Sequence, residues 1–445
     1  MESVNVGLAI VARKFFDMGY VQQVIPALND ALSDDHVRLQ STAEPILDAE
    51  GAERAARLFA GEGCDLLMVV CATFADASIV VALAKALDLP MVLWALAEPA
   101  SDTGRLRLNS FCGANLAGNA LVGLGRSFGF VYGAPDDPET VRELRSRLRV
   151  EAALKSLGRS RIGLFGVRPM GYYACNFDEM ELRRVVGAEV EYVSLPELQA
   201  RAEEGSPDEE AFLSDLAERT TSLDGLNPVE VQKTARSYAA LRAFVSERSY
   251  DAVAVRCWPE FFVDYGHAVC GAMSRLTDDG IMAACEADVN GAVTMMAQSH
   301  LSGGASFLAD LVAAEREDNS WLLWHCGAGP LSMASRERKP LVGYQPNRKL
   351  ATSLWFGMRS GTVTIARLGY QLGKYRMMVA KGEAIDQPGR YQGSNALVRL
   401  DGDALAGAKR LVELGFEHHV AMCYGDVVDE MAALAARWGI ELVRI

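Results

Sequence analysis

Residues 4–150 alternate uninterrupted apolar runs with segments of helical spacing, and this alternation restricts the fold more than any other feature. The apolar runs are Val4–Val11, Leu66–Val70 and Met91–Ala95, and helical spacing follows over Tyr20–Leu32 and Ala77–Leu87. Strands that are apolar on both faces are typical of parallel sheets covered by helices on both sides. The pattern therefore predicts an α/β domain built on a parallel sheet.

A second α/β unit is expected after a charged helix over Pro138–Leu157. A new strand follows at Arg161–Val167, and Glu189–Val193 and Ala252–Val255 continue the strand pattern. The residues at 202–207 are acidic and rich in turn formers, so we expect a surface loop or the start of a helix there.

Beyond the basic run at 336–340, strand-like segments replace the alternation. They are Thr362–Leu368, Tyr375–Ala380 and Ala396–Leu400, with one closing helix at Val427–Arg437. The predicted fold class is α/β, with two Rossmann-like domains on parallel sheets followed by a β-rich, barrel-like domain. The expected boundaries are 1–160, 161–338 and 339–445.

Composition excludes several classes of protein. The 445 residues are 50% hydrophobic and 23% charged, and 44 basic against 58 acidic side chains give a net charge of −14. This acidic balance argues against nucleic-acid binding and mildly against a polyanionic substrate. Nine cysteines without a CxxC pair indicate reduced thiols. The start of the chain has no signal-peptide pattern, and the most apolar stretch, Ile79–Ala97, is too polar for a membrane span, so we expect a cytoplasmic protein.

Common catalytic motifs are missing from the sequence. No GxGxxG follows the first strand, and neither GxxxxGK[ST] nor GxSxG occurs, which argues against dinucleotide binding, P-loop chemistry and a serine-hydrolase elbow. His325 and Cys326 are adjacent, but neighbouring side chains point in different directions, so they do not form a convincing nucleophile pair.

Four segments carry Glu, Asp or His at the edges of predicted strands, which is where α/β proteins build sites. Oxygen and nitrogen donors of this kind suit a divalent metal ion, although capping carboxylates and hydrogen-bonded core histidines are the structural alternatives. Because a strand alternates its side chains, at most one histidine of the adjacent pair is expected to face a given site. The residues are Glu286 with Asp288, Asp310, His325, and the pair His418–His419 before a strand at Val420–Tyr424.

At these positions the sequence resembles the superfamily of L-fucose and L-arabinose isomerases, which are metal-dependent aldose–ketose isomerases. The Glu-x-Asp-x-Asn-Gly segment at 286–291 and the Phe-x-Ala-Asp segment ending at Asp310 are similar to those of L-fucose isomerases. The resemblance implies that Glu286, Asp310 and His419 bind the metal, and His325 resembles a fourth ligand of the L-arabinose isomerases. The chain departs from L-fucose isomerases by carrying His418 where they have Asn, and from L-arabinose isomerases by carrying Asp310 where they have Glu.

The resemblance implies isomerisation of a neutral pentose or deoxyhexose through a cis-enediol. Glu286 and Asp310 would serve as base and acid, in an order left open, with Mn²⁺, or alternatively Mg²⁺ or Co²⁺, as the cofactor. Glu260 and Trp355 are weaker candidates for shaping the sugar pocket. The resemblance also suggests a homo-oligomer, with a hexamer favoured, in which Arg13 helps to complete a neighbour's pocket.

Two alternatives stay open at this point. One is a non-catalytic sugar-binding or regulatory protein, which would not need carboxylates and histidine at metal-binding positions. The other is a metal-dependent sugar aldolase or epimerase, which would stabilise the same enediolate and which only product analysis distinguishes.

Overall fold

The computed structural model describes residues 3–33, 37–42, 44–102 and 104–445, and the chain divides into two compact units, 1–152 and 153–445. None of the helices in these ranges is both long and apolar enough to cross a bilayer.

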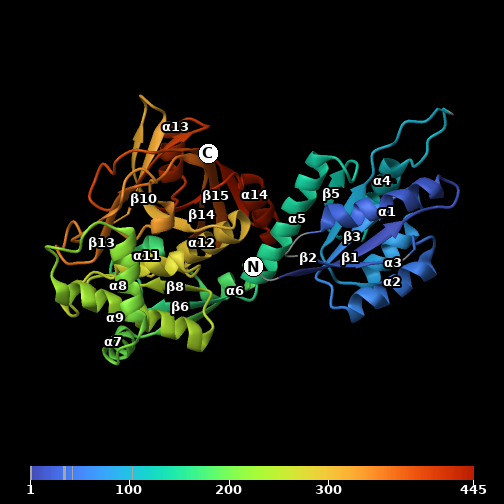
Figure 1. The fold of residues 1–445 in the computed structure, drawn as a ribbon. Helices are drawn as coiled ribbons and strands as arrows, with labels where there is room; N and C mark the ends of the chain where they lie inside the picture. The colour runs from blue at the N-terminus through green and yellow to red at the C-terminus, as the bar shows by residue number, and fades with distance from the viewer. Residues whose placement is uncertain (1–2, 34–36, 43, 103) are drawn as a thin grey trace. The chain divides into compact units, whose positions relative to one another are not determined.

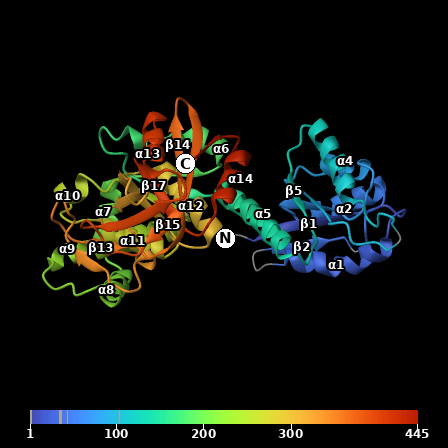
Figure 2. The same cartoon turned by 90° about the horizontal axis from the view of Figure 1, so that it is seen from above.

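The N-terminal unit is a parallel sheet in the order β2-β1-β3-β4-β5 with helices on both faces (Figures 1 and 2). Helices α2, α3 and α4 share one apolar core with the sheet, and α1 and α5 share the other. The strands are β1 Val4–Val11, β2 Val37–Ser41, β3 Leu66–Cys71, β4 Met91–Ala95 and β5 Gly129–Tyr132, and the helices are α1 Met18–Leu32, α2 Ala49–Gly61, α3 Ser78–Ala86, α4 Ser110–Gly123 and α5 Pro138–Leu157.

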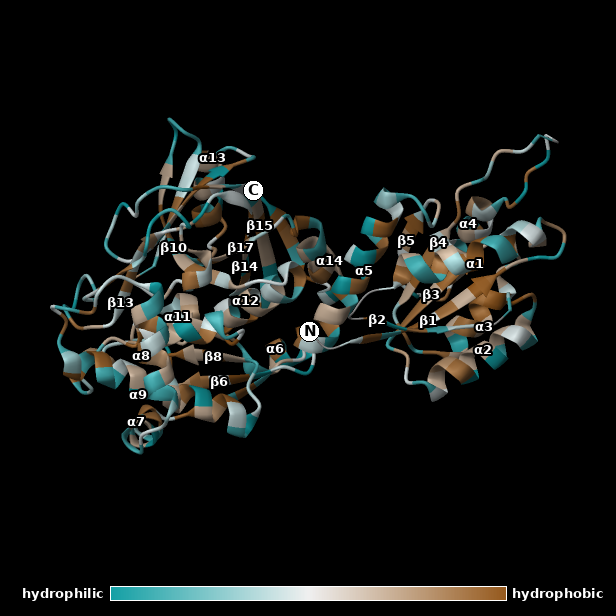
Figure 3. Ribbon diagram, in the orientation of Figure 1, coloured by the Kyte–Doolittle hydropathy of each residue, from teal (hydrophilic) through white to brown (hydrophobic). Residues whose placement is uncertain are grey.

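Burial on both faces explains the uninterrupted apolar runs of the sequence. Every residue of β3 and β4 is buried, and the strands of this sheet stand out as hydrophobic in Figure 3. At least two of the covering helices begin at capping aspartates, because Asp17 and Asp48 accept the amide hydrogens of Tyr20 and Gly51.

The C-terminal unit opens with a second parallel sheet, in the order β7-β6-β8-β9. Its strands are β6 Arg161–Phe165, β7 Glu189–Val193, β8 Ala252–Val255 and β9 Met282–Cys285. The helices of this part are α6 Glu179–Val185, α7 Leu195–Glu203, α8 Asp208–Arg219, α9 Pro228–Arg248, α10 Glu260–Val263, α11 Cys270–Asp278 and α12 Val289–Ser302.

A large mixed sheet completes this unit, in the order β12-β13-β16-β11-β10-β17-β14-β15-β18. An additional pairing of β15 with β16 closes the strands from β16 through β15 into a ring, which gives the barrel-like character expected from the sequence. The strands are β10 Ser306–Glu315, β11 Ser320–His325, β12 Leu341–Gly343, β13 Ser353–Gly357, β14 Gly361–Gln371, β15 Lys374–Ile385, β16 Ser394–Leu400, β17 His419–Tyr424 and β18 Glu441–Arg444, and the helices are α13 Ala404–Glu413 and α14 Val428–Trp438.

The predicted fold class is therefore confirmed: parallel α/β sheets precede a β-rich sheet. The C-terminal part carries a second helix, however, where the sequence predicted one closing helix. Helix α13 contains Gly407, which weakens its helical signal, and a Cβ at that position would lie 2.3 Å from Cγ2 of Ile445. Helix α13 packs so closely against Ile445 that position 407 favours glycine, a residue with low helix propensity.

The expected division at 338/339 falls inside the C-terminal unit. Strands β10 and β11 come before this position in the chain, yet they pair with β17 and β16 in the C-terminal sheet. This pairing places Asp310 and His419 in one sheet.

Candidate active site

Glu286 leaves the sheet at the carboxyl end of β9, which ends at Cys285. Glu286 and Ala287 both adopt left-handed backbone conformations, with φ of 59° and 58°. Such conformations are costly for residues other than glycine, and they cluster at functional sites. The turn separates Glu286 from Asp288, which caps the following helix α12.

Asp310 and His419 are brought together by strand pairing. They are directly opposite each other in the antiparallel register of β10 and β17, so their side chains leave the sheet on the same side. Asp310 lies within the long strand β10, and not at the end of a short strand as the sequence suggested. A register shift between Leu311 and Ala313 interrupts the ladder with β11 just after it.

Four of the predicted side chains converge at this point. His419 Nε2 lies 3.5 Å from Glu286 Oε2 and 3.6 Å from Asp310 Oδ1, and His418 Nε2 lies 3.6 Å and 3.7 Å from the same two oxygens. The expectation that only one of the two histidines could face the site is wrong. His418 precedes the first residue of β17, so the alternation of the strand does not apply to it, and the two rings lie 4.2 Å apart.

The carboxylate oxygens that face the histidines are buried but unsatisfied. Within the described chain, Glu286 Oε2 and Asp310 Oδ1 have no hydrogen-bond partner, although buried polar atoms normally have one. Two ligand atoms that each lie about 2.1 Å from one divalent ion are roughly 3.0–3.4 Å from each other. The N–O separations measured here are close to that range, and they are longer than ordinary hydrogen bonds. Glu286, His418 and His419 also offer atoms within 4.8 Å of one another. These residues therefore fit a metal ion.

A second group, Cys175, Asp288 and His419, has donor atoms equally close together but does not fit an ion. Both oxygens of Asp288 already accept hydrogen bonds from Gly291, Arg367 and His419. Burial also raises the pKa of the Cys175 thiol, which keeps it protonated and a poor ligand.

Electrostatics keep the Glu286 carboxylate ionised. Burial alone would raise the pKa of Glu286, but His418, His419 and His325 outweigh that effect and lower it, together with a hydrogen bond from Trp258. Burial likewise works against a charge on His418, but the carboxylates of Glu286 and Asp310 raise the pKa of this imidazole. The site can therefore hold negative charge at neutral pH, which attracts a cation.

Two aromatic side chains that the sequence did not single out border the carboxylates. Trp258, which follows the end of β8, donates from Nε1 to Glu286 Oε1 at 3.0 Å. The Tyr172 ring lies 5.0 Å from the Trp258 ring and 5.9 Å from the His418 ring, and burial together with Glu286 and Asp310 raises the pKa of its hydroxyl. Trp258 could have been found from the sequence because it follows a buried strand. Tyr172 lies in a loop, and no sequence pattern marks it as a site residue.

The remaining candidates have different surroundings. His325 is buried beside the site, with its ring 5.5 Å from that of His419 and its Nδ1 3.0 Å from the carbonyl oxygen of Leu308. The carboxylate of Glu260 is held by Arg256 at 2.7 Å, and the Trp355 indole donates to Ser353. Arg13 belongs to the N-terminal unit, where its backbone amide donates to Thr73.

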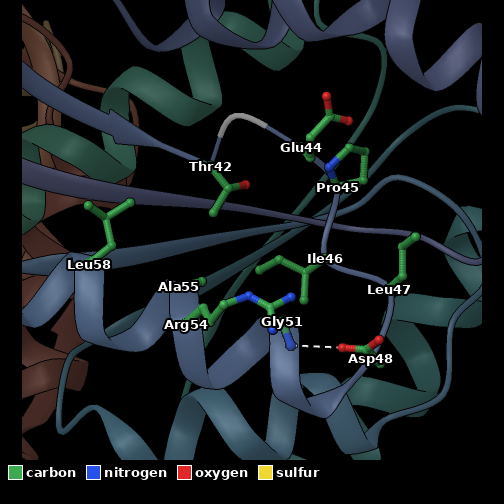
Figure 4. Close-up of a pocket in the computed structure, with 10 residues that line it drawn as sticks. All are labelled: Thr42, Glu44, Pro45, Ile46, Leu47, Asp48, Gly51, Arg54, Ala55 and Leu58. Carbon is green, nitrogen blue, oxygen red and sulfur yellow. Dashed lines mark hydrogen bonds between the residues drawn. The ribbon is translucent and has the colours of Figure 1, made fainter.

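The N-terminal unit has a pocket of its own, of about 310 Å³, at the start of α2 (Figure 4). The cap bond from Gly51 to Asp48 spans 2.7 Å at its rim. None of the predicted site residues belongs to its lining, which is Thr42, Glu44, Pro45, Ile46, Leu47, Asp48, Gly51, Arg54, Ala55 and Leu58.

Comparison with known proteins shows that a chain with this fold and site is a sugar isomerase, an enzyme that interconverts aldoses and ketoses. Residues 7–157 match the N-terminal domain of fucose and sulfoquinovose isomerases, and residues 323–445 match the C-terminal domain of L-fucose isomerase. The chain belongs to the fucose/sulfoquinovose isomerase family.

Similar proteins are sulfoquinovose isomerases. The one from Alkalicoccus urumqiensis is 34% identical over 86% of both chains, and the one from Priestia aryabhattai is 31% identical over 99% of both. That of Clostridium sp. (strain MSTE9) is 33% identical over 83% of this chain and 84% of its own. Family membership makes this chain an enzyme, so the alternative of a non-catalytic sugar-binding protein is not supported.

Proposed function

We propose that this enzyme interconverts the aldose and ketose forms of a sulfonated sugar of the sulfoquinovose type. The single observation that supports the chemistry is the convergence of Glu286, Asp310 and His419 around two buried carboxylate oxygens that have no hydrogen-bond donor among the residues the structure describes. The sugar follows from the relatives, which are named sulfoquinovose isomerases along nearly the whole chain. It replaces the neutral pentose or deoxyhexose expected from the sequence.

Glu286, Asp310 and His419 would hold the divalent ion, with His418 beside it. Bound there, the ion supplies Lewis-acid stabilisation of the charge that develops on the oxygens of the open-chain sugar. Mn²⁺ suits two carboxylates and an imidazole, and Mg²⁺ or Co²⁺ are alternatives.

The protein's own part in the reaction is proton transfer. One carboxylate removes the proton from C2 of the aldose, and the electron pair of that C–H bond forms the C1–C2 double bond while the π pair of the C1=O bond moves to O1. O1 takes up a proton to give the cis-enediol. O2 then loses its hydroxyl proton as the C2=O bond forms, and the C1–C2 π pair takes up a proton at C1, which gives the ketose. Glu286 and Asp310 are the acid–base pair for these steps. Their side chains are 14% and 28% exposed, so a substrate can reach both.

Product analysis tests the proposal. Metal-stripped enzyme is loaded with Mn²⁺, Mg²⁺ or Co²⁺ and incubated with a sulfonated aldose and, in parallel, with its non-sulfonated counterpart and neutral pentoses. We expect ketose to form from the sulfonated sugar and far less from the neutral ones. Preferential turnover of a neutral sugar would overturn the substrate assignment, and an epimer or cleavage products would indicate an epimerase or an aldolase.

A further inference from the structure

The His419 imidazole is held from behind by a buried carboxylate. Its Nδ1 lies 2.8 Å from Asp288 Oδ2, while its Nε2 faces Glu286 and Asp310. Asp288 is fully buried and caps α12, with Oδ1 accepting the amide hydrogen of Gly291 at 2.8 Å. Helix and carboxylate together therefore fix one edge of the His419 ring.

Arg367 also fixes this carboxylate, from β14, which pairs with the strand β17 that carries His419. Its guanidinium, on β14, donates to Asp288 Oδ2 at 2.5 Å and to Oδ1 at 3.1 Å, and it is itself fully buried. Two parallel hydrogen bonds of this kind fix both the position and the plane of a carboxylate. Glu417 also lies beside the guanidinium, with Oε2 3.5 Å from Arg367 Nε.

A carboxylate that receives hydrogen bonds from charged and backbone donors acts as an acceptor, so the direction of the Asp288–His419 hydrogen bond follows from the other groups that bond to Asp288. Arg367 donates to both oxygens of Asp288 and the Gly291 amide donates to Oδ1, so the carboxylate is surrounded by donors. Nδ1 is then the donor to Asp288, and Nε2 is the nitrogen left to bind an ion between Glu286 and Asp310. A neutral imidazole in this tautomer is the form that binds a metal.

We propose that Asp288 and Arg367 are positioning residues that set the tautomer and the direction of His419 toward the metal. Neither residue is one of the proposed ligands; Asp288 would act through His419, and Arg367 through Asp288. The inference rests on the proposed metal site. It also gives a role to a fully buried arginine in the buried part of a strand, where charged side chains are rare unless paired.

Metal affinity tests the inference without using turnover. Mn²⁺ binding to metal-stripped wild type and Asp288→Asn is measured by calorimetry, with circular dichroism as the check on folding. Loss of such an outer partner weakens metal binding by about 10- to 100-fold, and we expect a fall in this range. The matched control is Glu417→Gln, which removes a carboxylate from the same arginine but has no bond to the His419 ring, so its effect should stay below about threefold.

Gly291→Ala keeps the test decisive if Asp288→Asn does not fold. A Cβ at this position would lie 2.7 Å from Asp288 Oδ2, so the substitution displaces the carboxylate without removing its charge. It should weaken Mn²⁺ binding in the same direction. Folded variants that bind Mn²⁺ as tightly as wild type would overturn this inference alone. A wild-type enzyme that binds no divalent ion would overturn the proposed site and the inference with it.

Discussion

The indole of Trp258 donates to Oε1 of Glu286 at 3.0 Å, while Oε2 of the same carboxylate faces His418 and His419. One hydrogen bond thus fixes the rotation of the group that we assign to proton transfer. A hydrogen bond to a charged group contributes about 1.5–3 kcal/mol. Trp258 therefore orients the carboxylate and separates the roles of its two oxygens.

Trp258→Phe keeps an aromatic ring against Tyr172 but removes this donor. We expect turnover to fall about tenfold, since a loss of about 1.4 kcal/mol in orientation corresponds to that factor. Trp321→Phe is the matched control, because the Trp321 indole donates to the Ala404 carbonyl at 2.7 Å, in the buried core. Its thermal stability should fall while turnover stays normal. Equal turnover losses in the two variants would contradict the role of Trp258.

His418 and His419 should differ in their importance for metal binding. The side chain of His419 is 1% exposed and bound to Asp288, whereas that of His418 is 40% exposed. A histidine anchored on its second nitrogen is the better ligand. We expect His419→Asn to weaken Mn²⁺ binding by more than about 100-fold and His418→Asn by less than about tenfold. Calorimetric titration of the metal-stripped variants checks this, and equal losses would show that both imidazoles bind the ion.

Asp310→Asn keeps the size and shape of the side chain but removes its charge and its basicity. Turnover at saturating Mn²⁺ should fall by at least about 10²-fold, which is the lower end of general acid–base contributions. Metal affinity should fall as well. The melting temperature of the metal-free protein should change little or rise, because Asp310 Oδ1 is buried with no hydrogen-bond donor from the described part of the chain and lies near Glu286.

Glu315→Gln is the control for Asp310→Asn. Glu315 lies on the same strand and pairs with Arg390 away from the histidines. Its loss should leave turnover unchanged, since surface ion pairs contribute about 1 kcal/mol or less to stability. Near-normal turnover of Asp310→Asn would remove Asp310 from the site and leave it a strand residue.

The sequence predicted strands and helices well where the hydrophobic residues followed a single pattern. Strands Val4–Val11 and Met91–Ala95 agree with the structure residue for residue, because both faces of the sheet are buried and the strands are therefore mostly apolar. Helix α13 was missed because Gly407 meets a tertiary requirement at Ile445. Local sequence preferences cannot indicate a contact with a residue that lies far along the chain.

The site was predictable only as a set of residue types. Glu286, Asp310 and His419 follow from motifs, but the pairing of β10 with β17 that joins the last two depends on long-range register. The partners behind His419 were harder to foresee. Arg367 is a charged residue within the apolar segment Thr362–Leu368, and that anomaly indicates a buried partner without identifying Asp288.

His267 should make the stability of the C-terminal unit depend on pH. The side chain is 1% exposed, and its Nε2 lies 2.8 Å from the Ser237 hydroxyl. Burial lowers the pKa of His267 from 6.5 to about 4; the Tyr265 carbonyl opposes this shift, and the charge of Lys233 adds to it. Phe261, whose ring lies 5.3 Å away, completes an apolar environment that disfavours the imidazolium.

The direction of the effect follows from the two pKa values. The unfolded chain takes up a proton below pH 6.5 and the folded protein only near pH 4, so stability falls as the pH is lowered through this window and levels off below it. At pH 5 the loss is about 2 kcal/mol relative to neutral pH, because each pKa unit corresponds to about 1.4 kcal/mol. Urea unfolding of wild type and His267→Gln at pH 5 and pH 7.5 measures it. The variant should lack this part of the pH dependence, since glutamine does not titrate. An identical change in both proteins would show that His267 is not the group responsible.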